Sequence, residues 1–300
     1  MSGTQSASRR IKSVHDWVSE RVLLALMTAA ASNLSQRYPR KRAFITGAAS
    51  GLGLACAEIL AREGWQLFLN DVDLSRLSVV AERFRRDGAL VTTVEGDVRE
   101  SLALEQAIDE AVREAGGIDV AVNCAGVAWA GPFHSSTEQD WRWVMDINVL
   151  GVANASRAVI RHMARGPGGL IINIASAASF CTGSHMSAYN ASKAAVVALS
   201  ESLMQEYAAY GVKVLVAMPG FFVTRLMETA RGSEKTLSSA RKLVEQADTS
   251  AEQVAEAILW AAARGDTHCV YPEKYLWLWR LKRLMPKSFQ RILPKILGRR

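Results

Sequence analysis

Along most of this chain, short apolar and β-branched runs alternate with longer stretches that have helical periodicity. The predicted strands are residues 42–46, 66–70, 90–95, 120–123, 170–174, 213–218 and 268–271. The predicted helices lie between them, at residues 52–63, 75–86, 102–115, 138–163, 188–210 and 251–264. Because each helix returns the chain across a face of the sheet, consecutive strands run parallel. The pattern predicts an α/β fold: one doubly wound parallel sheet of about seven strands with helices on both faces.

Charge is distributed unevenly over the 300 residues. The formal net charge is +7, and the excess of Lys and Arg lies in residues 1–42 and 273–300. The region between them is mildly acidic, and with 49% hydrophobic residues the chain can bury a large core. We therefore expect a polar and amphipathic N-terminal extension at 1–39, a single domain at 40–272, and a basic, aromatic C-terminal tail at 273–300.

The cysteines and the apolar runs bear on the cellular compartment. The four cysteines stand far apart without a Cys-x-x-Cys pair, and His268 is the only histidine beside one of them. We therefore expect reduced thiols and no metal site. The longest apolar run near the start, residues 22–31, has about half the length that a bilayer span needs. Asp16, Glu20 and Arg21 interrupt the stretch where an export signal should become apolar. These features favour a cytoplasmic location.

A glycine-rich segment follows the first predicted strand and opens the first predicted helix. It reads Thr46-Gly47-Ala48-Ala49-Ser50-Gly51-Leu52-Gly53. Glycines allow backbone N–H groups to approach a pyrophosphate, and a helix N-terminus favours its negative charge. We therefore predict that a dinucleotide binds at Gly47, Ser50, Gly51, Leu52 and Gly53. A tight turn without a ligand is the alternative, because the spacing differs from the G-x-G-x-x-G fingerprint.

Asp71 follows the second predicted strand and lies 18 residues beyond Gly53. An acid at this place accepts hydrogen bonds from an adenosine ribose and repels a 2′-phosphate. Neither Ser50 nor Val72 provides a cation that offsets the repulsion. Asp71 therefore favours NAD over NADP. Taken alone, it also fits a turn or helix-capping acid.

Several polar residues follow predicted strands or begin helices in the second half of the chain. Tyr189 and Lys193 are four apart on one helix, so they share a face. A nearby ammonium lowers the pKa of a tyrosine, as an acid/base catalyst requires. Ser176, Asn123 and Asn148 stand where parallel strands and their connections converge on a crevice. Each also has a plainer explanation, as a surface ion pair, a turn residue, a strand end or a solvent-facing helix residue.

Over residues 40–272 the chain resembles the short-chain dehydrogenase/reductase family, specifically its single-domain type. The glycine turn matches T-G-x-x-x-G-x-G, and Asn148, Ser176, Tyr189 and Lys193 fall on the catalytic tetrad. Three further motifs agree in order and spacing: Asp97-Val98, Asn123-Cys124-Ala125-Gly126 and Pro219-Gly220-Phe221-Phe222-Val223-Thr224. The second residue of the N-N-A-G motif is replaced by Cys124, which we expect to alter turn packing more than chemistry.

The resemblance implies a Rossmann-type fold and an NAD-dependent alcohol dehydrogenase or carbonyl reductase, with a homo-oligomeric assembly. It implies that Tyr189 exchanges a proton with the substrate oxygen while hydride passes between substrate and nicotinamide. Lys193 would lower the tyrosine pKa and hold the ribose, Ser176 would bind the substrate oxygen, and Asn148 would hold a water. The implied cofactor contacts are Asp97, Val98, Asn123, Ala125, Gly126, Tyr189, Lys193, Pro219, Gly220 and Thr224. A non-catalytic NAD sensor on the same fold is the alternative.

The predicted substrate pocket has two interpretations, and so does the C-terminal tail. The resemblance places Phe180, Met186, Phe221, Phe222, Leu226 and Met227 around the substrate. They would suit a lipophilic alcohol or carbonyl compound, or they pack in the core.

Residues 271–286 mix aromatics, leucines and cations, which fits peripheral membrane contact or a helix packed on its own domain. We expect no nucleic-acid partner, since no recognition motif accompanies the charge.

Overall fold

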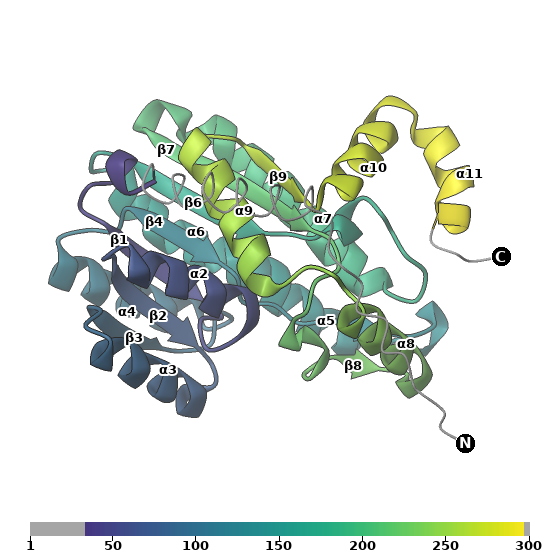
Figure 1. Ribbon diagram of the computed structural model, residues 1–300, viewed down its shortest axis with the longest axis horizontal. Coiled ribbons are helices and arrows are strands. Elements are labelled where there is room, and N and C mark those ends of the chain that lie inside the picture. The colour runs from purple at the N-terminus through teal and green to yellow at the C-terminus, as the bar shows by residue number, and fades with distance from the viewer. Residues whose placement is uncertain (1–33, 297–300) are drawn as a thin grey trace, which may run out of the picture.

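The computed structural model describes residues 34–296 of the chain, and Figure 1 shows one large sheet surrounded by helices. The strand order in this sheet is β3-β2-β1-β4-β6-β7-β9, and every neighbouring pair is parallel. The order reverses between β1 and β4, as a doubly wound topology requires. The predicted Rossmann-type sheet of about seven strands is therefore confirmed.

Each predicted strand is present, with ends that differ from the prediction by one residue at most. The strands are β1 Arg42–Thr46, β2 Gln66–Asp71, β3 Val91–Glu95, β4 Val120–Asn123, β6 Gly169–Ile174, β7 Val212–Pro219 and β9 His268–Tyr271. A second, two-stranded sheet was not predicted. It pairs β5 Trp129–Ala130 with β8 Arg231–Gly232.

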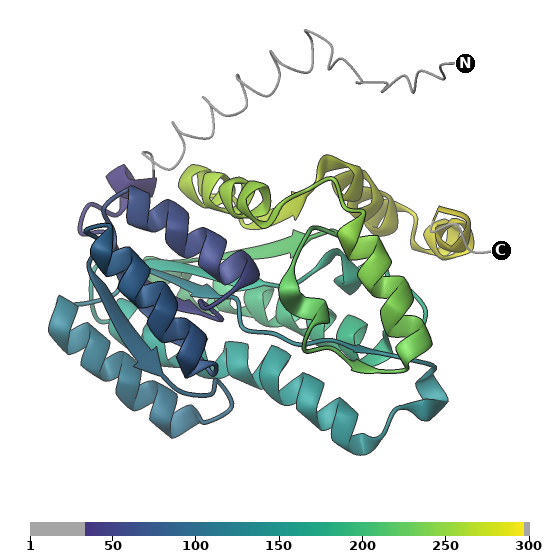
Figure 2. The same ribbon diagram turned by 60° about the horizontal axis from the view of Figure 1, so that its bottom comes forward.

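Helices cover both faces of the large sheet (Figure 2). One face packs against α2 Gly51–Arg62, α3 Leu74–Arg86 and α9 Ala251–Arg264. The other packs against α4 Ser101–Ala115, α6 Gly151–Met163 and α7 Ser187–Tyr207. The strands lie in the middle layer, so side chains on both sides of strands such as β1 and β6 are buried and their sequences are mainly apolar.

The helix predicted at 138–163 is interrupted. It consists of α5 Glu138–Met145, a π-helical turn at Asp146–Leu150 and α6. Gly151 follows the π-helical turn, and a Cβ there would lie 2.6 Å from Cγ2 of Val98. Close contact with Val98 therefore requires glycine where α6 begins. Single π-helical turns are frequent at functional sites.

Three further helices were not predicted as such. They are α8 Glu234–Glu245, α10 Glu273–Leu284 and α11 Pro286–Ile296. The short 3-10 helices are η1 Phe133–Ser135, η3 Ala177–Ser179, η4 Ala208–Tyr210 and η5 Arg225–Met227. Helices α10 and α11 contain most of the predicted tail, and they pack against a third core cluster that includes Val196 and Met218.

The N-terminal extension lies mostly outside the described residues. Its last part, from Leu34, begins with a helical turn whose Leu34 side chain is buried. Trp65 donates from Nε1 to Ser35 Oγ at 3.0 Å, which ties this turn to the domain. All four cysteines are free thiols. Among residues 34–296, no helix has the length and apolar character to cross a bilayer.

Candidate active site

A cleft of about 770 Å³ lies along the carboxyl ends of the strands. Its lining begins at the glycine turn after β1, continues past the ends of β2, β3 and β4, and reaches the segments after β6 and β7. Helices α8 and α10 supply further lining residues. In doubly wound folds the ligand crevice lies at this edge, where the strand order reverses.

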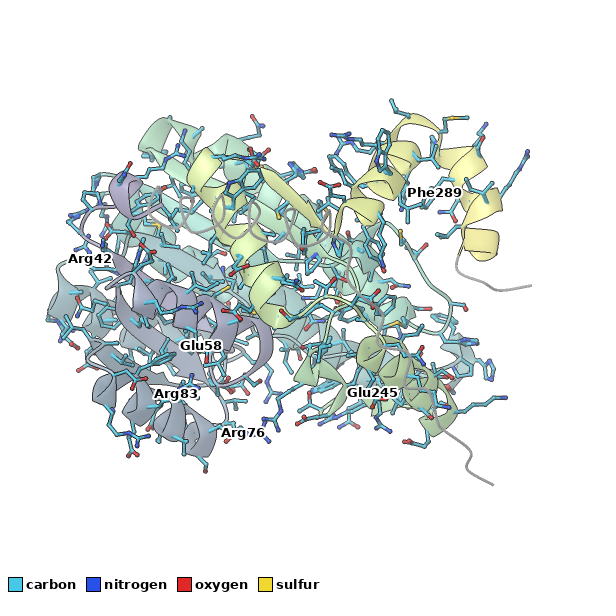
Figure 3. All side chains as sticks on the ribbon, in the orientation of Figure 1. Arg42, Glu58, Arg76, Arg83, Glu245 and Phe289 are labelled. Carbon is cyan, nitrogen blue, oxygen red and sulfur yellow. The ribbon has the colours of Figure 1, made fainter. Side chains whose placement is uncertain are left out.

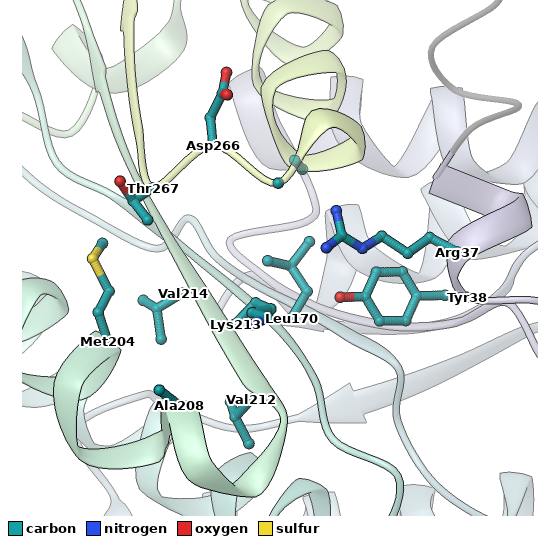
Figure 4. A pocket seen from close by; sticks show the side chains of 12 residues that line it. Arg37, Tyr38, Leu170, Met204, Ala208, Val212, Lys213, Val214, Asp266 and Thr267 are labelled. Atoms are coloured by element: carbon teal, nitrogen blue, oxygen red, sulfur yellow. The ribbon is translucent and has the colours of Figure 1, made fainter.

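A second, smaller pocket lies at the opposite edge of the sheet (Figure 4). Arg37 and Tyr38 line it from the N-terminal segment, and Asp266 and Thr267 line it from the turn between α9 and β9. None of the predicted site residues lines this pocket. The cleft at the carboxyl edge is therefore the candidate site.

The glycine turn is built by close backbone contacts. A Cβ on Gly53 would lie 2.2 Å from the carbonyl oxygen of Gly47, so only glycine lets α2 begin this near the turn. Gly47 has φ +65°, and a Cβ there would approach the Ala125 backbone to 2.9 Å. Gly47, Ser50, Gly51 and Leu52 line the cleft, whereas Gly53 lies behind them. Gly53 therefore shapes the turn without facing the cleft.

Asp71 lies at the end of β2 and lines the cleft. Its carboxylate accepts hydrogen bonds from the backbone N–H groups of Ala49, at 2.9 Å, and Asp73, at 3.0 Å. One oxygen thus fixes the glycine turn and the other fixes the start of α3. Asp71 is therefore a turn acid, and it also lies beside the cleft, where a ribose contact was predicted.

Sequence analysis missed Arg76, which also lines the cleft from the first turn of α3. Figure 3 shows its side chain extending from α3 toward the α8 side of the molecule. Arg76 Nε lies 3.2 Å from the Asp73 carboxylate, and Nη1 lies 3.9 Å from Glu228. Two carboxylates thus compete for this guanidinium. Arg76 is five residues beyond Asp71, and only the turn into α3 brings it to the cleft, so the positions next to the glycine turn and the acid do not indicate it.

Asp97 and Val98 follow β3 and line the cleft. The Asp97 carboxylate accepts hydrogen bonds from the Arg99 guanidinium, at 2.6 and 2.9 Å, and from the Arg99 backbone N–H, at 2.9 Å. The side-chain hydrogen bond from Arg99 holds the pKa of Asp97 below its ordinary value. Val98 is buried, and its carbonyl oxygen accepts from Asn154 of α6 at 3.0 Å. Both residues are therefore held rigidly.

Asn123, like Gly53, is a predicted cofactor residue that does not line the cleft. Its side chain is buried between sheet and helix, where Nδ2 donates to Ser156 Oγ at 2.9 Å and to Asn173 Oδ1 at 2.8 Å. It therefore joins β4, β6 and α6. The next residues, Cys124, Ala125 and Gly126, do line the cleft. Burial raises the pKa of the Cys124 thiol to about 12, so it stays protonated.

Tyr189, Ser176 and Lys193 meet at the cleft, as expected. Ser176 caps the 3-10 helix after β6, and Tyr189 lies in the first turn of α7. Lys193, one turn further along α7, is buried and donates from Nζ to the carbonyl oxygen of Ile174 at 2.8 Å. Its Nζ lies 5.8 Å from the centre of the Tyr189 ring. The strand end and the helix start thus bring the three groups together.

Burial is the largest influence on both ionisable groups. Desolvation raises the pKa of Tyr189, and hydrogen bonding with Ser176 acts in the opposite direction. Desolvation lowers the pKa of Lys193 from 10.5 to about 8. The expected lowering of the tyrosine pKa by Lys193 is therefore not the dominant effect here. At neutral pH the site holds a protonated tyrosine beside a protonated, buried lysine.

Asn148 lies in the π-helical turn and is fully buried. Its Oδ1 accepts from the Val127 N–H at 2.8 Å, and its Nδ2 donates to the Val127 carbonyl at 2.9 Å and to Ser192 Oγ at 3.0 Å. Ser192 in turn donates to the Tyr189 carbonyl at 2.8 Å. Asn148 thus connects the segment after β4 to α7 and does not line the cleft.

The segment after β7 closes the other side of the cleft. Pro219, Gly220 and Thr224 line it, and Thr224 Oγ1 accepts from the Leu226 N–H at 3.3 Å. A Cβ on Gly220 would lie 2.1 Å from the ring of Tyr275, so glycine is needed for α10 to pack here. Tyr275 also lines the cleft. The predicted tail at 273–300 thus contributes a residue to the site, which its sequence does not indicate.

Most of the predicted apolar pocket is present. Met186, Phe221, Phe222, Leu226 and Met227 line the cleft, whereas Phe180 is buried in the third core cluster. Leu243 and Val244 also line the cleft, within the stretch 226–247 that the resemblance places over the pocket, and Trp143, Ile147 and Tyr275 are lining residues that were not predicted. These residues come from α5, the π-helical turn, α8 and α10, and no local sequence pattern indicates that these elements meet.

Known proteins resemble this chain over most of its length. A family model described as short chain dehydrogenase matches residues 41–235. The 2,3-dihydro-2,3-dihydroxybenzoate dehydrogenase of Bacillus subtilis is 32% identical over 231 residues, which cover 73% of this chain and 88% of the relative.

Solved structures agree in fold. A short chain dehydrogenase/reductase from Burkholderia phymatum, in complex with NAD, has a TM-score of 0.76 and 30% identity, over 87% of this chain and 95% of its own. A gluconate 5-dehydrogenase from Burkholderia cenocepacia, in complex with NADP and tartrate, has a TM-score of 0.69 and 28% identity, over 79% and 95%. The chain therefore belongs to the short-chain dehydrogenase family and is an oxidoreductase of that type.

Proposed function

We propose that the chain interconverts an alcohol and a ketone or aldehyde with NAD(H), and that Tyr189 carries the proton. The observation that carries this proposal is one continuous cleft. The glycine turn lies at one end of the cleft. Tyr189 lies at the other end, hydrogen-bonded to Ser176 and close to the buried Lys193. A nucleotide site and an acid/base site thus share one cavity.

The residues around the glycine turn fit a dinucleotide. Gly51 has φ +55°, and a Cβ there would come within 3.3 Å of Thr224 Oγ1, so glycine leaves the space between these two walls of the cleft open. The N-terminus of α2 begins at this point, where backbone N–H groups favour a phosphate. Asp97, Val98, Ala125 and Gly126 line the cleft further on, and Pro219, Gly220 and Thr224 line its far wall. A bound nicotinamide would supply the hydride chemistry.

The protein's own groups handle the proton. Tyr189 keeps its proton at neutral pH because burial raises its pKa, so it is ready to donate to a carbonyl oxygen. Ser176 Oγ, on the same side of the cleft, hydrogen-bonds a substrate oxygen and stabilises negative charge that develops there. Lys193 presents an ammonium in a low-dielectric site and favours the phenolate left after donation. Asn148 acts as a positioning residue, through Ser192, for the turn that carries Tyr189.

NAD is favoured over NADP because of Asp71. Its carboxylate lies at the cleft edge and is fixed by two backbone N–H groups, so a 2′-phosphate brought near it meets a charge that cannot move away. Arg76 is the cation that can offset this repulsion, but its guanidinium is engaged by Asp73. Structures of both kinds, with NAD and with NADP, occur among the similar proteins. The preference therefore rests on these three side chains.

An apolar cavity favours a lipophilic alcohol or carbonyl substrate. Met186, Phe221, Phe222, Leu226 and Met227 line the cleft together with Trp143 and Leu243. Apolar walls with a few convergent polar groups are typical of small-molecule sites. We also propose a cytoplasmic location, which the four free thiols favour, and a homo-oligomeric assembly, by analogy with the family.

A screen of secondary alcohols with NAD and NADP, and of ketones with NADH and NADPH, tests the proposal through nicotinamide absorbance. Turnover of at least one lipophilic compound, faster with NAD(H), supports it. Tight binding of NAD without turnover of any compound would favour the NAD sensor instead. The variant Tyr189→Phe serves as the control for activity that does not come from this site.

A further inference from the structure

One side of the C-terminal tail is fixed on the domain. Helices α10 and α11 project beside β9 and α7 (Figure 1). Phe289 and Leu293, four apart on α11, are buried in the third core cluster, and Figure 3 marks the position of Phe289. Lys282 on α10 donates from Nζ to the carbonyl oxygen of Phe180 at 3.0 Å. On this side the tail packs on its own domain, which is one of the two alternatives that the sequence leaves open.

The opposite side of α10 is exposed and apolar. Trp277 and Leu284 are seven positions apart, so they share a helix face, and they are 69% and 82% exposed. Met285, which follows α10, is 51% exposed. Arg280 lies on the same face between Trp277 and Leu284, with its guanidinium 5.6 Å from the Trp277 ring. Single exposed apolar residues are ordinary, whereas large exposed apolar side chains that share a helix face are typical of interaction surfaces.

Exposed cations stand close to this cluster in the sequence. Arg280, Arg283, Lys287 and Arg291 are exposed, and within residues 34–296 only Arg283 has a carboxylate within ion-pair distance, Glu201 at 3.9 Å. Lys287 and Arg291, four apart, lie on the side of α11 opposite its buried residues. The surface therefore combines an apolar centre with uncompensated cations.

The tail surface is defined by Trp277, Arg280, Leu284, Met285, Lys287 and Arg291. We propose that the tail surface docks on an anionic lipid membrane. Anionic headgroups complement the cations, and the exposed Trp, Leu and Met side chains enter the interfacial layer. A second copy of the chain fits less well, because an isologous contact would bring like charges together. Nucleic acid offers no partner for the apolar centre. The proposal does not depend on the reaction in the cleft.

Sedimentation of the full chain with vesicles tests the proposal. The vesicles contain equal parts of phosphatidylglycerol and phosphatidylcholine, and pure phosphatidylcholine vesicles are the comparison. We expect binding to the anionic vesicles that weakens at high salt, because screening shortens the reach of the cations. The triple variant Arg280→Gln, Lys287→Gln, Arg291→Gln should bind on the order of a hundredfold more weakly, since each cation near such a surface contributes about fivefold. The double variant Trp277→Ser, Leu284→Ser should bind on the order of a hundredfold more weakly, since burial of each of these side chains contributes about tenfold or more.

Matched variants separate the tail surface from net charge and from general hydrophobicity. Arg86→Gln, Arg113→Gln, Arg165→Gln removes three exposed cations elsewhere, and Leu90→Ser, Leu102→Ser removes two comparably exposed leucines. Both controls should bind like the unmodified chain. Equal losses in the control and tail variants would overturn the proposal. The proposal would also be overturned if the unmodified chain did not bind the anionic vesicles and the tail variants instead dissociated an oligomer or lost binding to duplex DNA.

Discussion

Replacing Lys193 by Met should stabilise the protein while it removes activity. Lys193 is buried, and burial lowers its pKa from 10.5 to about 8. Holding it charged at pH 7 therefore destabilises the folded state by about 3 kcal/mol, at about 1.4 kcal/mol per pKa unit. Met has a similar length and no charge, but it leaves the Ile174 carbonyl without its hydrogen bond, which costs about 1 kcal/mol. The expected gain in the free energy of unfolding at pH 7 is about 2 kcal/mol.

The gain should depend on pH in a defined direction. The folded state releases the Lys193 proton near pH 8, whereas the unfolded state keeps it until pH 10.5. Between these values the unfolded state binds more protons, so the free energy of unfolding of the unmodified protein rises with pH. The variant has no lysine at this position, so its stability does not rise for this reason. At pH 9.5 the two proteins should differ by less than about 1 kcal/mol.

Urea unfolding of the nucleotide-free proteins at pH 7 and pH 9.5 measures both effects. Lys213→Met is the control, because Lys213 is an exposed lysine on β7 and its loss should change stability by about 0.5 kcal/mol or less at either pH. A Lys193→Met variant that is less stable than the unmodified protein at pH 7 would refute the reasoning. So would a stability gain that is the same at both pH values.

Three further predictions concern the cofactor end and the tail. Asp71→Ser should narrow the ratio of kcat/KM for NAD over NADP by about tenfold or more, through weaker NAD use and weaker rejection of the 2′-phosphate; an unchanged ratio in steady-state kinetics would place Asp71 away from the ribose. Gly53→Ala should destabilise the protein by about 3 kcal/mol or more in urea unfolding, because its Cβ would lie 2.2 Å from the Gly47 carbonyl oxygen. Gly183→Ala, with nothing within 4 Å of the added Cβ, should be nearly neutral, and equal losses would contradict the clash argument. Lys282→Met should raise KM more than it lowers kcat, because it frees the Phe180 segment beside the substrate region; a loss confined to kcat would count against this.

The sheet could be predicted from the sequence because its strands are buried on both faces. A run such as residues 169–174 is then mainly apolar, with Asn173 as its polar residue, and glycines mark where helices end and strands begin. The site at the carboxyl edge follows from the order of these strands. Tyr189, Lys193 and the glycine turn were identified because their spacing is set within one helix or one turn.

The rest of the site depends on contacts that no local pattern encodes. Asn123 ends its strand as predicted, but its side chain turns inward to Ser156 and Asn173, which are distant in sequence. Tyr275 reaches the cleft only because α10 folds back on the segment after β7. Helix α8 buries Leu237 and Val244 against Met227 of η5 and borders the cleft, and the sequence of α8 does not indicate this packing partner.

The most direct measurement of the proposed mechanism is single-turnover and steady-state kinetics of Tyr189→Phe, together with its NAD affinity. The change removes the hydroxyl and little volume, so NAD should bind within about threefold of its normal affinity while kcat falls by about 100-fold or more. Tyr207→Phe, on the same helix but outside the cleft, is the matched control and should keep normal kcat. A Tyr189→Phe variant with near-normal kcat, on any alcohol or ketone that the unmodified protein converts, would contradict the central claim that this hydroxyl carries the proton.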